Sequence, residues 1–196
     1  MEKRIFLIRH CEASGQPPEA NLTEKGFSQA QELAVFFSNV RVDRIISSPF
    51  IRAIQSIEPL AEKMRIKVEI DERLSERILS KRLLPDWMEK LEATFMDLDL
   101  EWEGGESSRN AMMRVVKVVE EALQSKEENT LMVTHGNLMA LLIKHYQHEF
   151  NFEEWKKLRN PDVFQLHFID NRVNVKRIWK EDWVSGTVTG VNNESN

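Results

Sequence analysis

The amino-acid sequence predicts an α/β fold of three layers, an α/β/α sandwich in which helices cover both faces of a mainly parallel central sheet. Short apolar runs rich in branched residues, such as 4–8 (RIFLI) and 130–134 (TLMVT), are typical of buried strands. Several such runs are followed by longer segments with apolar residues three or four positions apart, as on one face of a helix. Strands that alternate with helices favour a parallel sheet.

The first half of the chain alternates between strand and helix patterns. A loop with one Gly and two Pro follows the first strand, and Thr23 is the expected N-cap of the next helix. Residues 43–48 predict a second strand, and Pro49 fits the first turn of a second helix. Residues 66–70 alternate as a third strand does. The apolar stripe of the second helix contains Ile54, Ile57, Leu60 and Ala61.

The second half begins with a segment that interrupts this alternation. Residues 77–103 contain no glycine and many large apolar side chains, and we interpret them as a small helical insertion over the site. Gly104-Gly105 breaks the chain before a helix over 107–123. Helical spacing returns from about Asn137 to Tyr146.

The end of the chain predicts a hairpin and a tail. Residues 163–169 and 173–179 alternate as paired strands, with Asn171 at the turn. The residues after Trp183 are poor in core side chains. We therefore expect a single domain over residues 1–182, with 77–103 as its cap, and a mobile C-terminal tail over residues 183–196.

Composition excludes several classes of protein. With 196 residues the chain is long enough for one domain with a sizeable core. A net charge of −5 argues against broad attraction to nucleic acid or anionic membranes. The only cysteine, Cys11, rules out an intramolecular disulfide and a cysteine-based zinc cluster. The apolar run near the amino terminus is too short for a signal peptide or a membrane span, so a cytoplasmic protein is expected.

Polar residues follow three of the predicted strands. Arg9 and His10 close the first strand, Ser47 and Ser48 close the second, and His135 follows the run TLMVT. Ligands of parallel sheets bind outside the carboxyl ends of the strands. These side chains are therefore expected at one edge of the sheet, where a site would form.

The dipeptide Arg9-His10 suits phosphoryl chemistry. A neutral imidazole is a good nucleophile toward phosphorus, and a guanidinium group binds phosphate oxygens bidentately. A histidine bonded to the backbone beside a solvated arginine explains the same two residues, because such a dipeptide is common by chance. The residues around it decide between the two interpretations.

Six segments in order accompany this dipeptide, and together they resemble the histidine phosphatase superfamily, also called the phosphoglycerate mutase-like family. The resemblance covers roughly residues 4 to 142. The segments are LIRHCEASGQ, LTEKGFSQA at 22–30, SSPFIRAIQS at 47–56, RLSE at 73–76, EGGES at 103–107 and VTHGNLM at 133–139.

The resemblance implies a phosphorylated nucleophile at His10. Arg9, Arg52 and His135 would complete a charged pocket around the phosphoryl group and neutralise the charge of its oxygens in the transition state. Taken alone, Arg52 could equally be a solvated surface residue, and His135 could simply cap the following helix.

Three further positions match the family. Gln16 corresponds to an amide side chain that often points at the phosphate. Glu76 matches the proton donor of the leaving oxygen, although only its register after Leu74 distinguishes it from neighbouring carboxylates. The amides that begin at Gly136 would favour a bound anion.

The sequence departs from the family motif at Cys11, where a glycine is usual. A cysteine fits there if φ is negative. We then expect slower turnover and a site that is sensitive to oxidation. Cys11 as a nucleophile is rejected, because cysteine phosphatases need an arginine six positions later and this chain has Pro17.

We therefore expect a metal-independent phosphatase, without cofactor, that acts on a small-molecule phosphate ester; the oligomeric state stays open. A phosphoglycerate mutase is disfavoured because SERILSKRLLPDW lacks the Tyr-Gly stretch of mutases and is short and apolar. Arg77, Lys81 and Arg82 are candidates to contact a second anionic group. A catalytically weak phosphoryl-binding regulatory protein is the remaining alternative. His145 and His148 lack a third metal ligand and are expected at the surface.

Overall fold

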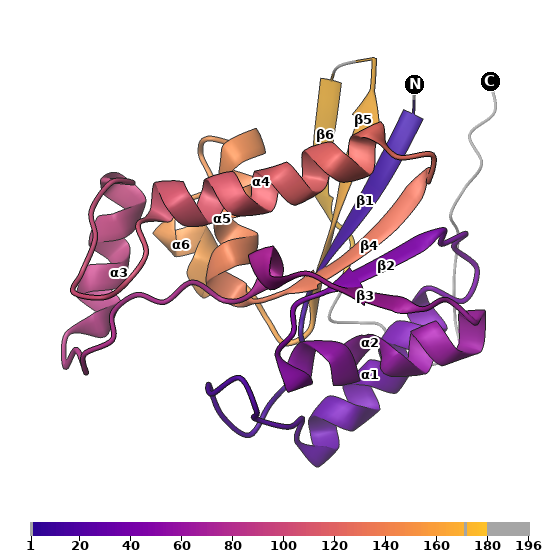
Figure 1. Cartoon of the computed structure of the whole chain (residues 1–196), viewed down its shortest axis with the longest axis horizontal. Helices are drawn as coiled ribbons and strands as arrows, with labels where there is room; N and C mark the ends of the chain where they lie inside the picture. Colours follow the sequence, from indigo (N-terminus) through magenta and orange to yellow (C-terminus); the bar gives the residue numbers. More distant parts are fainter. Residues whose placement is uncertain (1, 171, 180–196) are drawn as a thin grey trace.

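The computed structural model describes residues 2–170 and 172–179, and there a single six-stranded sheet lies between two layers of helices (Figure 1). The predicted α/β fold is confirmed. The strands are β1 (Glu2–Arg9), β2 (Arg44–Ser47), β3 (Val68–Ile70), β4 (Asn129–Thr134), β5 (Asp162–Ile169) and β6 (Arg172–Arg177). The helices are α1 (Glu24–Phe36), α2 (Ile51–Met64), α3 (Trp87–Met96), α4 (Ser108–Gln124), α5 (Gly136–Tyr146) and α6 (Phe152–Lys156), with a 3-10 turn η1 (Glu72–Leu74).

The order of the strands brings the polar strand ends together. The sheet runs β3-β2-β4-β1-β5-β6, and its first four strands are parallel. Arg9 at the end of β1 lies opposite Thr134 of β4, and Ser47 at the end of β2 lies opposite Val133. The predicted hairpin is the antiparallel pair β5 and β6. Its expected turn residue, Asn171, and the predicted tail at 183–196 lie outside the described residues.

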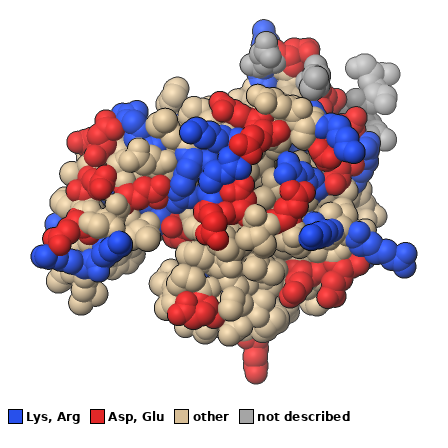
Figure 2. Space-filling model, viewed as in Figure 1, with Lys and Arg blue, Asp and Glu red and all other residues tan. Residues whose placement is uncertain are grey.

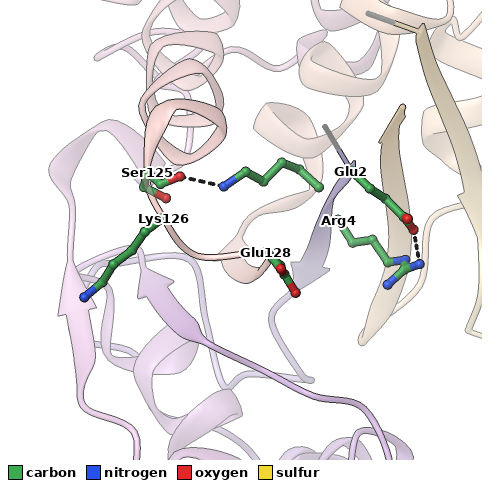
Figure 3. Close-up of a pocket in the computed structure, with 6 residues that line it drawn as sticks. Glu2, Arg4, Ser125, Lys126 and Glu128 are labelled. Carbon is green, nitrogen blue, oxygen red and sulfur yellow. Dashed lines mark hydrogen bonds and ion pairs between the residues drawn. The ribbon is translucent and has the colours of Figure 1, made fainter. Parts of the chain in front are cut away.

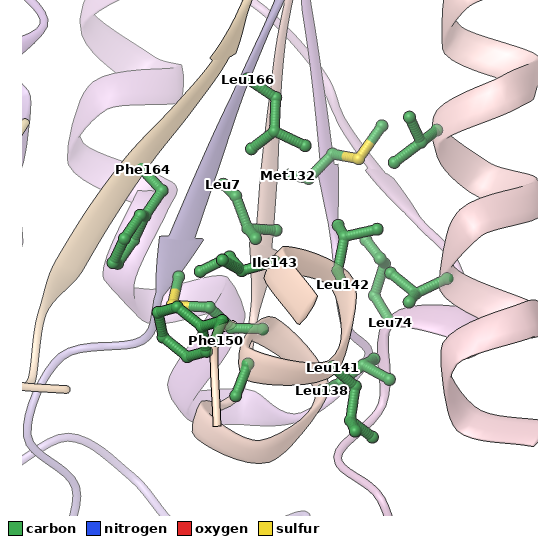
Figure 4. Packing of buried hydrophobic residues seen from close by; sticks show 14 of the residues in the cluster. Leu7, Leu74, Met132, Leu138, Leu141, Leu142, Ile143, Phe150, Phe164 and Leu166 are labelled. Carbon is green, nitrogen blue, oxygen red and sulfur yellow. The ribbon is translucent and has the colours of Figure 1, made fainter. Parts of the chain in front are cut away.

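Both faces of the central strands are buried, as a parallel sheet between two helical layers requires. Alternate residues of β1 enter different clusters: Ile5 and Leu7 pack with α4 and α5, whereas Phe6 and Ile8 pack with α1 and α2. Figure 4 shows the first cluster, in which side chains of α5 meet Leu7 and other side chains of the sheet. The sheet is therefore held rigidly from both sides.

Local details confirm some expectations and correct others. The Thr23 side chain accepts a hydrogen bond from the Gly26 amide and caps α1 as predicted. Pro49, expected in the first turn of the next helix, instead precedes the N-cap Phe50 of α2. The segment 77–103 is less helical than predicted, because only α3 is regular there and residues 77–86 have no helix. The sequence does not predict the short helix α6.

A cavity of about 390 Å³ lies at the amino end of β1, away from the strand ends described above (Figure 3). The buried Lys3 ammonium donates to the carbonyl oxygens of Ser125 (2.5 Å) and Glu127 (2.7 Å) just after α4. A cation at this position stabilises the carboxyl end of a helix. The cavity is lined by Glu2, Lys3, Arg4, Ser125, Lys126 and Glu128.

Charges of both signs are interspersed on the face that Figure 2 shows. Arg73 pairs with Asp71 and Glu121, and Arg114 pairs with Glu106. The same view shows a notch between the lobe of α3 with its flanking segments and the lobe of α1 and α2. None of the helices in the described ranges is long and apolar enough to span a bilayer.

Candidate active site

Several of the predicted site residues lie at the carboxyl ends of three neighbouring strands, β2, β4 and β1. Hydrogen bonds of the sheet continue one residue past the strands: the His10 amide donates to Thr134 O (3.0 Å), and the Ser48 amide donates to Val133 O (2.9 Å). The backbone of His10 and Ser48 is therefore fixed by the sheet itself. His135 is the N-cap residue of α5, directly after β4.

His10 is held with one ring nitrogen bonded and the other directed at an arginine. Its Nδ1 lies 2.7 Å from Cys11 O, which can only accept, so Nδ1 carries the proton. Its Nε2 is then unprotonated, and the lone pair of this nitrogen accepts from Arg52 Nε at 3.2 Å. Burial lowers the pKa of His10 to about 3, and Arg52 and Arg9 act in the same direction. His10 is therefore a neutral imidazole at pH 7, as a nucleophile must be.

Arg52 and Arg9 bring two positive charges to the buried site. Arg52 lies in the first turn of α2, is 1% exposed, and donates through Nη1 to Pro17 O (2.8 Å). Arg9 donates to Leu158 O (3.0 Å), and its buried Nε has no hydrogen-bond partner in the part of the chain that is described. Burial lowers the pKa of both guanidinium groups, and the Glu76 carboxylate opposes this effect. Two desolvated cations that donate to carbonyl oxygens favour the binding of an anion.

His135 completes the cluster from the opposite side. It is fully buried, its ring centroid lies 5.1 Å from that of His10, and its Nδ1 is 3.4 Å from Arg52 Nη2. Ser48 Oγ lies 2.7 Å from its Nε2. Burial lowers the pKa of His135 well below its ordinary value, and His10 and Arg52 lower it further. The fold thus brings together His10, Arg9, Arg52 and His135 in the way the sequence predicts.

Glu76 also lies at this site, at the amino end of α5. Its carboxylate accepts from the amides of Asn137 (3.0 Å), Leu138 (3.0 Å) and Arg77 (2.9 Å). Gly136 precedes these amides and packs against the Arg9 guanidinium. The carboxylate therefore accepts hydrogen bonds from backbone amides in the first turn of α5. It also lies near Arg9 and Arg52, as its effect on their pKa values indicates.

Gln16 is the predicted site residue that the structure does not bring into the cluster. It is exposed and forms no hydrogen bond with any residue in the described ranges. The neighbouring loop is nevertheless attached to α2, through Arg52 and through the Ile51 amide, which donates to Pro18 O at 2.9 Å. A role of Gln16 in phosphate binding stays a prediction.

Asn160 is a site residue that sequence reasoning missed. Its Nδ2 donates to His10 O at 2.7 Å, and its own carbonyl accepts from Gln29 Nε2 at 2.7 Å. Together with the bond between Arg9 and Leu158 O, this contact attaches the segment before β5 to both residues of the Arg-His pair. The sequence contains no signal for it beyond an Asn-Pro step before a strand.

Cys11 fits the position where the family usually has glycine. Among the described non-glycine residues only Arg65 and Asp170 have positive φ, so Cys11 meets the expected condition of a negative φ. Its side chain is fully buried, and burial raises the pKa of the thiol to about 12. The thiolate is the reactive form of cysteine. The expectation of a site open to oxidation is therefore wrong for the folded chain.

The two histidines at the end of α5 are exposed, as expected. Burial still lowers the pKa of His145, and the nearby His148 adds to this effect. Within residues 2–170 and 172–179, no group of three or more His, Cys, Asp and Glu side chains is arranged to hold a metal ion.

Comparison with known proteins agrees with this geometry. The sequence model of the histidine phosphatase superfamily (branch 1) matches residues 5–180. The chain belongs to this superfamily. Two proteins of Hydrogenobacter thermophilus are each 28% identical to it; one, phosphoserine phosphatase 1, aligns over 145 residues, 66% of this chain and 69% of its own. The prediction of a histidine phosphatase, a phosphoric monoester hydrolase, is confirmed.

Solved structures show the same fold. A mycobacterial glucosyl-3-phosphoglycerate phosphatase superimposes with a TM-score of 0.73 at 22% identity, covering 90% of this chain and 97% of its own. A phosphoserine phosphatase of Entamoeba histolytica superimposes with a TM-score of 0.73 at 19% identity, covering 88% of this chain and 94% of its own. At these identities the similarity supports the fold of this histidine phosphatase.

Proposed function

We propose that this histidine phosphatase hydrolyses a small phosphate monoester in two steps, with His10 as the nucleophile. In the first step His10 Nε2 bonds to phosphorus while the bond from phosphorus to the leaving oxygen breaks. In the second, water attacks phosphohistidine and releases inorganic phosphate. The observation that carries the proposal is the neutral His10 ring, whose Nε2 lone pair lies 3.2 Å from Arg52 Nε.

The charge of the transferred group would be neutralised by Arg9 and Arg52. The phosphoryl oxygens carry spread negative charge in the transition state, and desolvated guanidinium groups stabilise it more strongly than solvated ones would. The amino end of α5 adds backbone dipoles beside His135 and Gly136. This set of donors supplies the electrostatic role that a metal ion has in other phosphatases, and we propose that the reaction is metal-independent.

Glu76 is the proposed proton donor to the leaving oxygen. An ionised carboxylate has about four lone-pair positions, and three backbone amides occupy three of them here. One position is left for a proton that Glu76 can give to the leaving oxygen and later take from the attacking water. The effect of Glu76 on the pKa values of Arg9 and Arg52 places its carboxylate beside the proposed phosphate pocket.

The proposed substrate is a small phosphorylated metabolite. Phosphoserine is the first candidate to test, because the relative from Hydrogenobacter thermophilus carries the name phosphoserine phosphatase 1. Of the basic residues expected to bind a second anionic group, Arg77 is buried and donates to Glu106 O, Thr94 Oγ1 and Ser108 Oγ. Arg82 pairs with Glu103. The Nη2 of Arg77, which has no hydrogen-bond partner among the described residues, and Lys81 therefore remain candidates for a substrate carboxylate.

The test combines an assay with detection of the intermediate. Purified enzyme treated with EDTA is assayed with phosphoserine and with p-nitrophenyl phosphate, and denatured enzyme is analysed for an acid-labile phosphohistidine. We expect turnover without metal and label at residue 10, both lost in His10→Ala. Full activity in His10→Ala would refute the mechanism, and activity that needs an added metal would refute metal independence.

The two alternatives make different predictions. A phosphoglycerate mutase would isomerise phosphoglycerate in the presence of its bisphosphate, and we expect no such activity. A phosphoryl-binding regulatory protein would bind phosphate without forming phosphohistidine, and Cys11→Gly would then raise turnover sharply. We also propose a cytoplasmic enzyme. Its net charge of −5 supports the proposal that it has no nucleic-acid partner.

A further inference from the structure

Ser48 has a contact that the reaction described above does not use. It follows β2 directly, is 0% exposed, and has its backbone fixed by the bond from its amide to Val133 O. Its Oγ lies 2.7 Å from Nε2 of His135, on the side of the ring away from Arg52. The direction of this hydrogen bond decides where the proton of His135 sits.

The hydrogen of the Ser48 hydroxyl needs an acceptor, and the ring of His135 offers one. A serine hydroxyl has one hydrogen and two lone pairs. The Phe50 amide donates to Ser48 Oγ at 3.3 Å and occupies one lone pair. Among the described residues, His135 Nε2 is the one acceptor that the Ser48 hydroxyl reaches. A buried hydroxyl hydrogen without an acceptor is destabilising, so the hydrogen points at Nε2.

We propose that Ser48 is a positioning residue that holds His135 as the neutral tautomer with its proton on Nδ1. This inference rests on the proposed function, because it assigns His135 its role toward the phosphoryl group. Nδ1–H and Arg52 Nη2 then face each other at 3.4 Å, and both are donors. An oxygen of the phosphoryl group would accept from both at once, and His135 would donate without a positive charge of its own.

Both histidines thus carry their proton on Nδ1, but His10 faces the phosphate with Nε2 and His135 faces it with Nδ1. In His10 the carbonyl of Cys11 keeps the proton on Nδ1, so that Nε2 offers a lone pair to phosphorus. In His135 the hydroxyl of Ser48 occupies Nε2, so that Nδ1 offers a proton to oxygen. The acceptor Cys11 O thus fixes the tautomer of the nucleophile His10, and the donor Ser48 Oγ fixes the tautomer of His135.

Nuclear magnetic resonance of ¹⁵N-histidine-labelled full-length protein without ligand tests the tautomer independently of catalysis. Two-bond nitrogen–carbon-proton correlations at pH 7 distinguish the tautomers, with His135→Asn as the assignment control. We expect the Nδ1–H form for His135 in the natural protein and in Ser48→Thr, and a change to Nε2–H in Ser48→Ala. The Nε2–H form in the natural protein would overturn the inference, even if His10 proves to be the nucleophile.

Kinetics of matched variants tests the consequence. Ser48→Ala should lower kcat about 100-fold, at the lower end of the loss found when one aligned donor is removed, with a smaller effect on KM. Ser47→Ala is the control, because Ser47 is equally buried and its Oγ donates to Ser48 O at 2.9 Å. It should stay within about threefold of the natural protein. If Ser48 acts through His135, the double variant Ser48→Ala/His135→Asn loses no more than His135→Asn alone; additive losses would contradict it.

Discussion

The guanidinium group of Arg9 lies so close to Gly136 that a side chain at position 136 would press against it. A Cβ there would stand 3.0 Å from both Cζ and Nε of Arg9, so the arginine would have to shift by a few tenths of an ångström. The glycine after His135 thus leaves room for the arginine, which passes over the beginning of α5. This contact connects a residue at the end of β1 to the first turn of a helix that follows β4.

Gly136→Ala should therefore shift Arg9 relative to the phosphate. We expect kcat/KM to fall by up to about 100-fold, because a misplacement of about 1 Å can cost that much. Thermal unfolding should change little, because alanine favours a helix by up to about 1 kcal/mol and this offsets part of the strain. Steady-state kinetics with p-nitrophenyl phosphate and a melting curve separate the two effects. Unchanged kcat/KM would contradict the assigned role of Arg9.

Glu76→Gln should affect substrates according to their leaving groups. Phosphoserine leaves as an alkoxide that needs a proton, so its kcat should fall about 100-fold or more. p-Nitrophenol needs no proton to leave, so kcat with p-nitrophenyl phosphate should change far less. Glu72→Gln, at an exposed carboxylate on the same segment, is the matched control. Equal losses with both substrates would show that Glu76 does not donate the proton.

Asn160→Ala should lower kcat about tenfold with a small change in KM, because the residue holds the His10 backbone through its hydrogen bond to His10 O. Asn174→Ala, at an exposed position of β6, is the control and should resemble the natural protein. A larger effect on KM than on kcat would argue for direct substrate binding by Asn160.

Protonation of His10 in the unfolded chain should make the fold less stable in acid. The imidazole of the unfolded chain takes up a proton below about pH 6.5, whereas His10 in the folded chain does so only near pH 3. Between these values the unfolded state binds more protons, so the free energy of unfolding decreases as the pH falls. At pH 4.5 the loss from His10 alone is about 2–3 kcal/mol.

Urea unfolding at pH 7 and pH 4.5 measures this effect. His10→Gln should lose less stability over this interval than the natural protein, whereas His148→Gln, at an exposed position, should lose as much. An equal loss in His10→Gln and in the natural protein would show that His10 is not a buried neutral group.

Cys11 should be unreactive in the folded enzyme. Its thiol is fully buried with a pKa of about 12, so iodoacetamide at pH 8 should modify it only after unfolding in urea. Cys11→Gly should change kcat by less than about threefold, because the negative φ of position 11 and the bond from its amide to Ser56 Oγ (2.8 Å) do not need a particular side chain. Rapid modification of the native protein would contradict this burial.

The sequence predicted those parts of the site that depend on the sheet. Arg9, His10 and His135 follow apolar runs, and adjacent parallel strands must place their ends together. Asn160 could not be found in this way, because its contact with His10 depends on the path of the loop before an antiparallel strand. The segment 77–103 was assigned too much helix because its large apolar residues also suit an irregular segment. The burial of Cys11 could not be predicted from the sequence, because it depends on the side chains that pack around it in the fold.

The hydrogen bond between Asn160 and His10 joins residues 150 positions apart. Because Arg9 is likewise held by Leu158, the nucleophile reaches its final geometry only when the segment that leads into β5 has docked. A chain still being synthesised, with residues beyond 156 not yet free of the ribosome, would contain His10, Arg52, Glu76 and His135 and still lack these supports. Phosphatase activity should therefore arise late in biosynthesis, after nearly the whole domain has emerged.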